Sequence, residues 1–588
     1  MATSSRCRAV LALACVVVSA ALAGCGPSPQ PQGPVKKPPS QASQQWTTLA
    51  NGFIEDSLRA QPFFAAQSGR HEFDGQLPDL SAHGIKREIA RLHDARAQFE
   101  AVDPKALEPR ERFDREYLIA VVDQQLFWQE KARLPFTNPY WYLDRLDPDM
   151  FLSRDYAPLP VRMKAFIKYA RGIPHMVTDI QANLAGPLPK TYVELGIADF
   201  GGLAEFYAKN VAPVFASVAD PDLQKELAAA DADAATAMNN LKIHFLELRK
   251  TATDKFAIGK ESFAAMLNDT ERVDIAVADV EAAGRADLER NTQALKAACE
   301  AYLPKAGLAA CVAKMSADKP AGGPVEAARL QLVDLRKFIE EKHVVSISGN
   351  EQAKVAEAPI YNRTNSAFIQ VPGPYDHGVD SVYNIAPPNP QWSKAEQAAY
   401  IPAKATLLFT SVHEVWPGHY LQFLHSNANP DKLEALWVGY AFAEGWAHYT
   451  EEMMYDEGLG RDEPELHIGQ LVDALLRDVR LLSAIGLHTE GMTVAQSEKM
   501  FREQAFQDPG NARQQAARGT YDPAYLNYTL GKLMIRKLRA DWLTKQGKSP
   551  TDQASWGEFH DTFLSYGGPP IPLLRREMLG ESAAGGLL

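Results

Sequence analysis

The chain has 588 residues, of which 46% are hydrophobic and 23% are charged, and its formal net charge is −12. This composition is typical of a globular protein with a large hydrophobic core. The acidic balance argues against a nucleic-acid partner, which would need a basic face on the protein.

The N-terminus predicts export from the cell. Arg6 and Arg8 precede an apolar run from Ala9 to Leu22, and the first acidic residue is Glu55. A short basic region followed by a short apolar run is typical of a secretory signal and is too short to span a membrane. Residues 1–24 are therefore predicted to be a lipoprotein signal peptide.

The apolar run ends in Leu22-Ala23-Gly24-Cys25, which resembles a bacterial lipobox. In such proteins the cysteine becomes the lipidated first residue of the mature chain. We therefore expect a protein on the periplasmic side of the cell envelope, anchored to the membrane through Cys25. The alternative is a simple cleaved signal followed by a chance cysteine.

After the signal, residues 25–45 are rich in Pro, Gln and Ser and predict a flexible tether. From Trp46 onward, apolar residues recur at three- and four-residue intervals, which indicates helices. The clearest predicted helices are Ile85–Val102, Arg110–Arg133, Asp222–Thr251, Val273–Tyr302 and Val325–His343.

Two short segments interrupt the helical pattern. Val344–Ser348 and Ala367–Val371 contain β-branched and aromatic residues bounded by Gly, Pro and Asn, so we predict a small β-sheet there. The fold is thus predicted to be mainly α, with many helices and this small sheet near the functional site. Residues 46–340 would form a helical scaffold half and residues 341–588 the catalytic half of the same globular body.

Two cysteines remain in the mature chain besides Cys25. Cys299 and Cys311 flank a Pro- and Gly-containing break between two helical patterns. In an oxidising periplasm, a disulfide that closes this helical hairpin is favoured. The alternative is a pair of buried free thiols.

The segment His413-Glu414-Val415-Trp416-Pro417-Gly418-His419 carries the chemistry. A hydrolytic zinc site needs three protein ligands, an open position for water and a nearby carboxylate as general base. The common motif places two histidines four residues apart on one helical face. Here they are six apart, a rotation of about 600° in a regular helix. We predict that Pro417 and Gly418 distort the helix into a bulge that brings the histidines together.

Glu444, about 30 residues later, is the predicted third ligand because it lies among small and aromatic residues, where an unpaired carboxylate would be costly. His448 and Glu451 follow on the same helical face and could orient a ligand histidine. The alternative is a helix with solvated acids and one satisfied histidine.

These motifs, His-Glu-x-x-Pro-Gly-His and Glu444-Gly445-Trp446-Ala447, resemble the bacterial family known as domain of unknown function 885 (DUF885), whose members are often lipoproteins. That family is similar to the helical zinc peptidases of the thimet oligopeptidase and carboxypeptidase Taq kind, so the resemblance implies a zincin-like fold. It extends over roughly Trp46 to the C-terminus. Four further blocks carry it: Ile360-Tyr361-Asn362, Arg480–His488, Tyr528–Lys532 and Gly568–Leu573.

The resemblance implies a role for each matching residue. His413, His419 and Glu444 would be the zinc ligands, and Glu414 would be the general base. Tyr528 would donate its phenol to the developing oxyanion, and His488 is a second candidate for that role or for holding the substrate. Two positions depart from the family pattern: Tyr420 stands where a second histidine is frequent, and Ala484 where an aspartate is common. The second departure puts the orientation of His488 in doubt.

The sequence as a whole predicts an exported, lipid-anchored zinc peptidase. It would hydrolyse peptide bonds, in short peptides, by metal-activated water with Glu414 as general base, and the Ala367–Val371 strand could pair with extended substrate. Two alternatives stay open. One is a non-catalytic binding or scaffold lipoprotein on the same fold, and the other is a zinc amidase that acts on peptidoglycan peptides.

Overall fold

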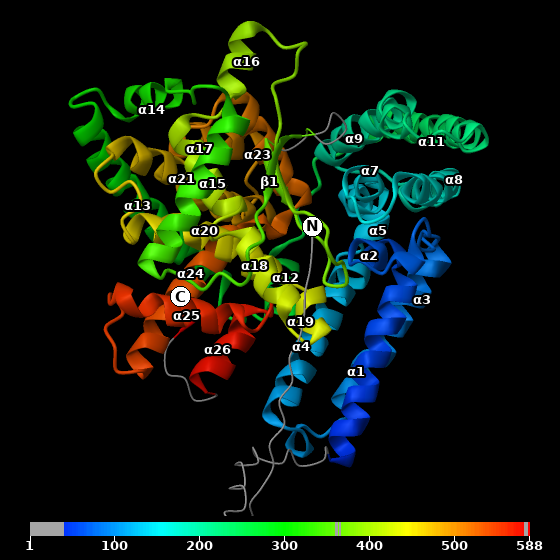
Figure 1. Cartoon of the computed structure of the whole chain (residues 1–588), viewed down its shortest axis with the longest axis horizontal. Helices are drawn as coiled ribbons and strands as arrows, with labels where there is room; N and C mark the ends of the chain where they lie inside the picture. Colours follow the sequence, from blue (N-terminus) through cyan, green and yellow to red (C-terminus); the bar gives the residue numbers. More distant parts are fainter. Residues whose placement is uncertain (1–39, 359–362, 364–365, 581–585) are drawn as a thin grey trace, which may run out of the picture.

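The computed structural model describes residues 40–358, 363, 366–580 and 586–588. Within these ranges the chain is mainly α-helical and contains one small three-stranded sheet, as predicted (Figure 1). The predicted signal peptide, Cys25 and the Ile360-Tyr361-Asn362 block lie outside the described residues. Among the described helices, none is both long enough and apolar enough to cross a membrane.

The chain begins with a helical arm, the blue end of Figure 1. Its helices are α1 (Gln41–Ala60), α2 (Pro62–Gln67), α3 (Ala82–Glu100) and α4 (Pro109–Leu126), with a 3-10 turn η1 (His71–Phe73) after α2. Its core also contains Leu433, Leu436 and Leu573, so the arm packs against the C-terminal part of the chain.

Helix α1 starts at Gln41, five residues before the predicted start at Trp46. The Ser40 side chain accepts a hydrogen bond from the Ser43 N–H at 3.0 Å and caps the helix. The Ser43 hydroxyl in turn donates to Glu111 on α4 at 2.9 Å. The last residues of the predicted tether are therefore helical and packed on the arm.

A second group of helices has its own hydrophobic core, built largely on α8, α9 and α11. The group comprises α5 (Leu134–Thr137), α6 (Tyr140–Leu143), α7 (Asp149–Ser153), α8 (Leu159–Asn183), α9 (Lys190–Lys209), α10 (Val211–Phe215) and α11 (Pro221–Leu248).

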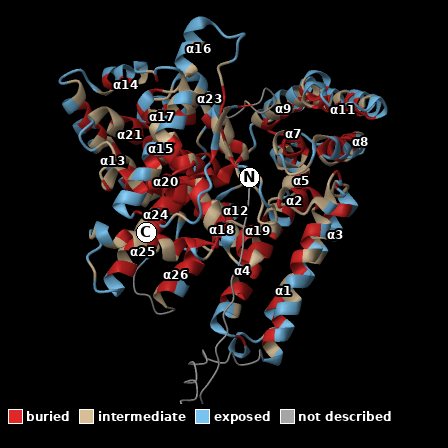
Figure 2. Ribbon diagram, in the orientation of Figure 1, coloured by how far each residue is buried: buried red, intermediate tan, exposed pale blue. Residues whose placement is uncertain are grey.

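The largest core belongs to the rest of the chain, where the buried residues of Figure 2 gather around α20. Its early helices are α12 (Lys260–Glu271), α13 (Val277–Tyr302), α14 (Leu308–Ala317) and α15 (Pro324–Lys342). Its later helices are α16 (Lys394–Tyr400), α17 (Lys404–Glu414), α18 (His419–Ala428), α19 (Lys432–Leu436), α20 (Tyr440–Asp456), α21 (Pro464–Thr489), α22 (Val494–Gln504), α23 (Pro509–Tyr521), α24 (Asn527–Lys545), α25 (Trp556–Leu564) and α26 (Ile571–Leu579). Helices α12–α14 and most of α15 precede residue 340, the predicted border between the two halves, and share this core with the later helices.

The small sheet contains β1 (Lys354–Glu357), β2 (Ala367–Gln370) and β3 (Val382–Ile385) in the order β1-β3-β2. β1 runs parallel to β3, and β2 runs antiparallel to it. The strand predicted at Ala367–Val371 is thus confirmed and lies at an edge of the described sheet.

The strand predicted at Val344–Ser348 is wrong, because this segment is irregular. Its backbone binds side chains instead of another strand. The Val344 carbonyl accepts a hydrogen bond from the His560 ring at 2.6 Å, and the Ser346 N–H donates to Asp561 at 2.7 Å. The β-branched pattern reflects burial of Val344 and Val345 in the main core.

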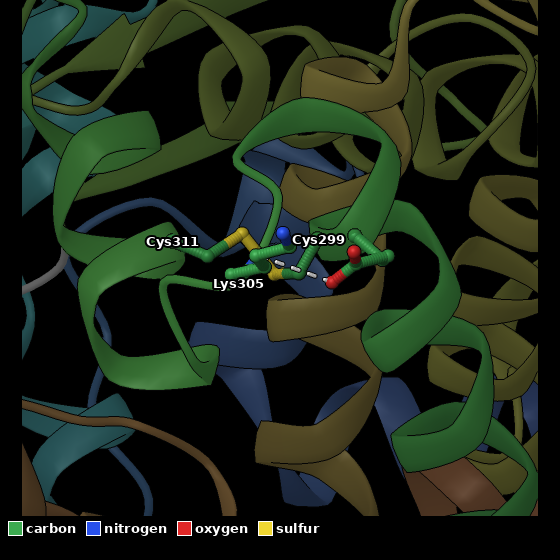
Figure 3. Close-up of a disulfide and its surroundings, with 4 residues drawn as sticks. Cys299, Lys305 and Cys311 are labelled. Carbon is green, nitrogen blue, oxygen red and sulfur yellow. Dashed lines mark hydrogen bonds between the residues drawn. A yellow bond between two sulfur atoms is a disulfide. The ribbon is translucent and has the colours of Figure 1, made fainter.

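The predicted Cys299–Cys311 disulfide is present and joins α13 to α14, with 5.7 Å between the two Cα atoms (Figure 3). The turn between the helices is also held by the Lys305 N–H, which donates to the Glu300 carboxylate at 3.2 Å. Both helices pack on α21, so the bridge belongs to a hairpin that is fixed to the main body of the protein.

Candidate metal centre

The His413–His419 segment is a break between two helices. Helix α17 ends at Glu414 and α18 begins at His419, and the Trp416–Pro417 peptide bond between them is cis. The structure therefore has a break between two helices where we predicted a bulge within one helix. Gly418 is required for space, because a Cβ atom there would lie 1.8 Å from the His413 carbonyl oxygen.

The break nevertheless brings the two histidines together, as the zinc hypothesis requires. The ring centroids of His413 and His419 lie 4.8 Å apart, and the rings are perpendicular. Glu444, on α20, places its Oε2 atom 3.4 Å from His413 Nε2 and 3.3 Å from His419 Nε2. One ligand atom from each residue thus lies within 4.8 Å of the other two.

The residues that follow Glu444 explain why α20 lies at this place. The Trp446 indole N–H donates to the Pro417 carbonyl at 2.8 Å and fastens α20 to the break. Gly445 packs directly on Gly531 of α24, since a Cβ atom on Gly445 would lie 2.5 Å from the Gly531 Cα. The Glu-Gly-Trp motif therefore supplies one candidate ligand and the two contacts that position it.

Glu451 binds the Nδ1 atom of His413, whereas the Nε2 atom of that ring faces Glu444. Its carboxylate accepts a hydrogen bond from His413 Nδ1 at 2.7 Å, and it also lies 3.2 Å from Arg477 and 3.3 Å from His448. Burial alone would raise the pKa of Glu451, but Arg477 and the two histidines hold that pKa well below its usual value. The predicted orienting role of Glu451 is thus supported, while His448 contacts Glu451 and not a candidate ligand.

Charge at the cluster favours an ionised Glu444. Burial alone would raise the pKa of Glu444, but His419 and His413 hold it well below its usual value. The Oε2 atom is buried and forms no hydrogen bond, although both imidazoles are close. A buried oxygen that accepts no hydrogen bond is costly, and a cation between the three side chains would offset that cost.

Glu414 lies next to the cluster at the end of α17. Its carboxylate accepts a hydrogen bond from the Ile369 backbone N–H of β2 at 3.1 Å. Burial raises the pKa of Glu414, an effect that His413 and His419 partly offset. A carboxylate with a raised pKa is suited to taking up a proton and giving it back.

Tyr528, on α24, is also brought to the cluster. Its ring lies nearly parallel to that of His413 with the centroids 6.4 Å apart, and the Arg480 guanidinium carbon lies 4.7 Å from the Tyr528 ring centre. Burial and the neighbouring Glu444 raise the pKa of Tyr528. The phenol therefore keeps its proton at neutral pH and can serve as a hydrogen-bond donor.

His488, the second predicted candidate for the oxyanion or for holding the substrate, contacts the backbone through both ring nitrogens. Its Nδ1 atom accepts the Ile258 N–H at 3.3 Å, and its Nε2 atom lies 2.7 Å from the Gly519 carbonyl. Burial lowers the pKa of His488 to about 4, so the ring is neutral. Both ring nitrogens are committed to the backbone, and the residue ties the end of α21 to the start of α12 and to α23.

The sequence analysis assigned no role to two residues at the centre. Arg477 pairs with Glu451, and Arg480 lies over the Tyr528 ring. Their three-residue spacing on a predicted helix places them on one face, which is the only local signal available. Charged residues at that spacing are far more often solvated, so the pattern alone does not mark a site.

Comparisons with known proteins identify relatives without an assigned activity. No curated protein matches the sequence. The family described as "Bacterial protein of unknown function (DUF885)" matches residues 62–578. A solved structure of a proposed lipoprotein of unknown function from Shewanella oneidensis is 22% identical, with a TM-score of 0.72 over 91% of this chain and 99% of that one. A proposed lipoprotein from Colwellia psychrerythraea is 16% identical, with a TM-score of 0.75 over 92% and 99%. These likenesses establish the fold.

Proposed function

This chain belongs to the DUF885 family of bacterial proteins, and we propose that it is an exported, lipid-anchored zinc peptidase. The observation that carries the proposal is the convergence of His413 and His419, from the two sides of a helix break, with Glu444 of α20. Two histidines and a glutamate form a ligand set that catalytic zinc sites use.

Two of the three spacings between the ligand atoms fit zinc. Zinc–nitrogen and zinc–oxygen bonds of about 2.0–2.2 Å in a tetrahedral site place neighbouring ligand atoms roughly 3.3–3.5 Å apart. The Glu444 oxygen lies 3.4 and 3.3 Å from the two Nε2 atoms. The missing hydrogen bond at that oxygen and the hydrogen bond that His413 Nδ1 donates to Glu451 support the same assignment.

A zinc ion held by these three side chains would supply Lewis-acid activation of water and of the scissile carbonyl. Glu414 is placed to take the proton from the attacking water and to return it to the leaving amine. The Ile369 N–H holds one oxygen of that carboxylate, which limits its rotation. Tyr528 donates its phenolic hydrogen to the oxyanion that develops on the former carbonyl oxygen.

The edge of β2 supports a peptide as the substrate. In an antiparallel pair, successive residues alternate between bonding to the partner strand and pointing outward. The Ser366 carbonyl bonds to Ala386, which places Phe368 and Gln370 toward β3 and Ile369 outward. The Ile369 N–H on this edge donates to Glu414, so an extended peptide that adds beside β2 would bond through the other outward groups of the strand, next to Glu414.

The cell location in the proposal comes from the N-terminus. The Leu22-Ala23-Gly24-Cys25 motif predicts lipidation of Cys25, and both similar solved structures are described as proposed lipoproteins. The protein would act on the periplasmic side of the cell envelope, with the membrane as its partner through the lipid. Short peptides are the substrates that such a location offers to a buried site.

Metal analysis combined with a peptide-library digest tests the proposal. The purified protein should contain one zinc per chain and cleave peptides, and chelation should abolish cleavage until zinc is restored. Glu414→Gln should keep the zinc and lower kcat by at least about 100-fold. Full activity in that variant would remove the base assignment.

Two other results would overturn the peptidase proposal. Absence of stoichiometric zinc would favour a binding or scaffold protein. Bound zinc with release of muropeptides but no cleavage of ordinary peptides would favour an amidase.

A further inference from the structure

Arg480, on α21, is a buried cation that no carboxylate of the described residues neutralises. The residue is 8% exposed, and its Nε atom donates to the neutral side chain of Gln515 at 2.9 Å. Within the described chain its two Nη atoms form no hydrogen bond, and neither is among the enclosed side-chain atoms that lack a partner. The fork formed by these two atoms is therefore open to a ligand.

The two arginines beside Arg480 are both paired with acids, which makes Arg480 the exception. Arg477 lies 3.2 Å from Glu451, and Arg518 lies 3.0 Å from Asp522. Burial lowers the pKa of Arg480, and the positive charges of Arg518 and Arg477 lower it further. A buried charge is costly unless a counter-charge meets it, so an anion bound at Arg480 would offset an unfavourable arrangement.

Tyr528 places Arg480 at the candidate metal centre. The Arg480 guanidinium carbon lies 4.7 Å from the Tyr528 ring centre, which in turn lies 6.4 Å from the ring centre of His413. The guanidinium carbon is thus no more than about 11 Å from the His413 ring centre. Burial and Glu444 raise the pKa of Tyr528, whereas Arg480 acts in the opposite direction. The candidate ligand and the unneutralised cation therefore both lie close to the same phenol.

The shape of the open fork selects a carboxylate. The two Nη atoms of an arginine lie in one plane and match the two oxygens of a carboxylate, which they bind by parallel hydrogen bonds. The bond from Nε to Gln515 limits the rotation of that plane. Arg480 is thus prepared for bidentate binding of a carboxylate next to the phenol that we assign to the oxyanion.

The carboxyl end of a peptide is the carboxylate that suits this place. It is present whatever the sequence of the peptide, and the main chain alone sets its distance from the cleaved bond. An extended chain advances about 3.3 Å per residue, so one or two residues span roughly 3–7 Å and three span about 10 Å. The guanidinium carbon lies 4.7 Å from the Tyr528 ring centre, which favours the shorter spans.

We propose that Arg480 binds the free C-terminal carboxylate of the substrate, so that the protein releases one or two residues from the carboxyl end of a peptide. The inference rests on the proposed peptidase function and adds the substrate class to it. Water adds across the peptide bond one or two residues before the C-terminus: its oxygen joins the carbonyl carbon, and a proton goes to the leaving amine. The carboxylate at Arg480 keeps its charge and takes no part in these bond changes.

The test uses the zinc-loaded protein and a ten-residue peptide in three forms: ending in a free carboxylate, ending in an amide, and ending in an aspartate whose main chain is amidated. Products are identified by mass spectrometry. We expect release of one or two C-terminal residues from the free acid, with kcat/KM lower by at least about tenfold for both amides. Cleavage counted from the amino end, internal cleavage, or an equal rate for either amide would overturn the inference and leave the peptidase proposal intact.

A binding measurement separates failure of the inference from failure of the peptidase proposal. The Glu414→Gln variant is titrated calorimetrically with the free-acid and the amidated peptide, and the free acid should bind at least about tenfold more tightly. Equal Kd values would overturn the inference, whatever the native protein cleaves. Absence of cleavage together with a preference for the free acid would count against the peptidase proposal alone.

Variants assign the preference to Arg480. Arg480→Gln should bring the kcat/KM ratio of free acid to amide toward one, and Arg480→Lys should keep part of the ratio because it retains the charge without the fork. Arg539→Gln is the matched control, since Arg539 is also 8% exposed but binds Tyr449 and lies over Trp556. A ratio is insensitive to partial loss of folded protein. An unchanged ratio in Arg480→Gln, or an equal fall in Arg539→Gln, would overturn the assignment.

Discussion

Replacing Glu451 by glutamine removes the negative charge next to His413 Nδ1 and keeps the shape of the side chain. In the native structure this carboxylate accepts the hydrogen of His413 Nδ1 at 2.7 Å, which orients the ring and makes its Nε2 atom a better electron donor. The amide oxygen of the glutamine could still accept that hydrogen, but without the full charge. We therefore expect weaker zinc binding with an intact set of ligands.

The size of the effect follows from the contacts of Glu451. Loss of a partner of a metal-binding histidine typically lowers metal affinity about 10–100-fold, which is roughly 1.4–2.8 kcal/mol. Glu451 is fully buried and also balances Arg477 at 3.2 Å, so in the variant Arg477 keeps only its longer ion pair with Asp473, at 3.7 Å. We place the expected loss in the upper part of that range, and we expect a lower free energy of unfolding as well.

The assay is competition for zinc with a chromophoric chelator, and the neighbouring residue supplies the control. Glu452→Gln removes a buried carboxylate of the same helix that lies 2.8 Å from Arg290 and 3.1 Å from Arg536. That variant should also unfold more easily, yet its zinc affinity should equal that of the native protein. Equal zinc affinity in the Glu451→Gln and Glu452→Gln variants would refute the role assigned to Glu451.

Two further predictions concern the Tyr528 phenol and the ion pairs that His71 forms with Asp376 and Asp74. Tyr528→Phe should lower kcat about 100-fold or more and leave zinc content and KM nearly unchanged. Steady-state kinetics and metal analysis measure these three quantities. A kcat above a tenth of the native value would contradict the role of Tyr528 at the oxyanion. Because the pKa of His71 is raised from 6.5 to about 9, its stabilisation is complete below pH 6.5 and is lost as pH rises through 9, by at most about 3 kcal/mol. Urea unfolding at pH 7 and pH 10 measures this loss, and His71→Gln should abolish it; a loss that persists in the variant would contradict the assignment.

Local patterns in the sequence were sufficient for the features that local physics decides. Helices such as α11 and α13 follow from apolar periodicity, and β2 follows from its β-branched and aromatic residues. The pairing of Cys299 with Cys311 followed from a short hairpin in a chain predicted to be exported. In each case the residues that determine the structure lie within a few turns of one another.

Features that depend on tertiary contacts were only partly predictable. The convergence of His413 and His419 was a stated requirement, but its form as a helix break depends on Trp446, which binds the Pro417 carbonyl from another helix. Val344 and Val345 look like strand residues because burial in a helical core selects the same side chains as a sheet does. No pattern near His488 indicated that Ile258 and Gly519 would occupy both ring nitrogens.

No pattern in the sequence indicates the cavity of about 420 Å³ that Ile369 and Gly373 line. Its walls come from α2, α7, β2 and α19, which are spread over the chain between residues 62 and 436. Polar residues such as Asp149 stand in no distinguishing pattern along the chain, and only the folded structure shows that they line a cavity. The lining of this cavity was therefore beyond the reach of the sequence.

The contact between Gly445 and Gly531 has a consequence for how the centre tolerates change. Glu444 and Tyr528 belong to different helices, and the separation of these helices is set by main chain against main chain. Since no side chain lies between them at this point, no change of rotamer can absorb an added atom. A single methyl group on either glycine is thus the smallest alteration that would move the phenol away from the ligands while every reactive residue stayed in the sequence.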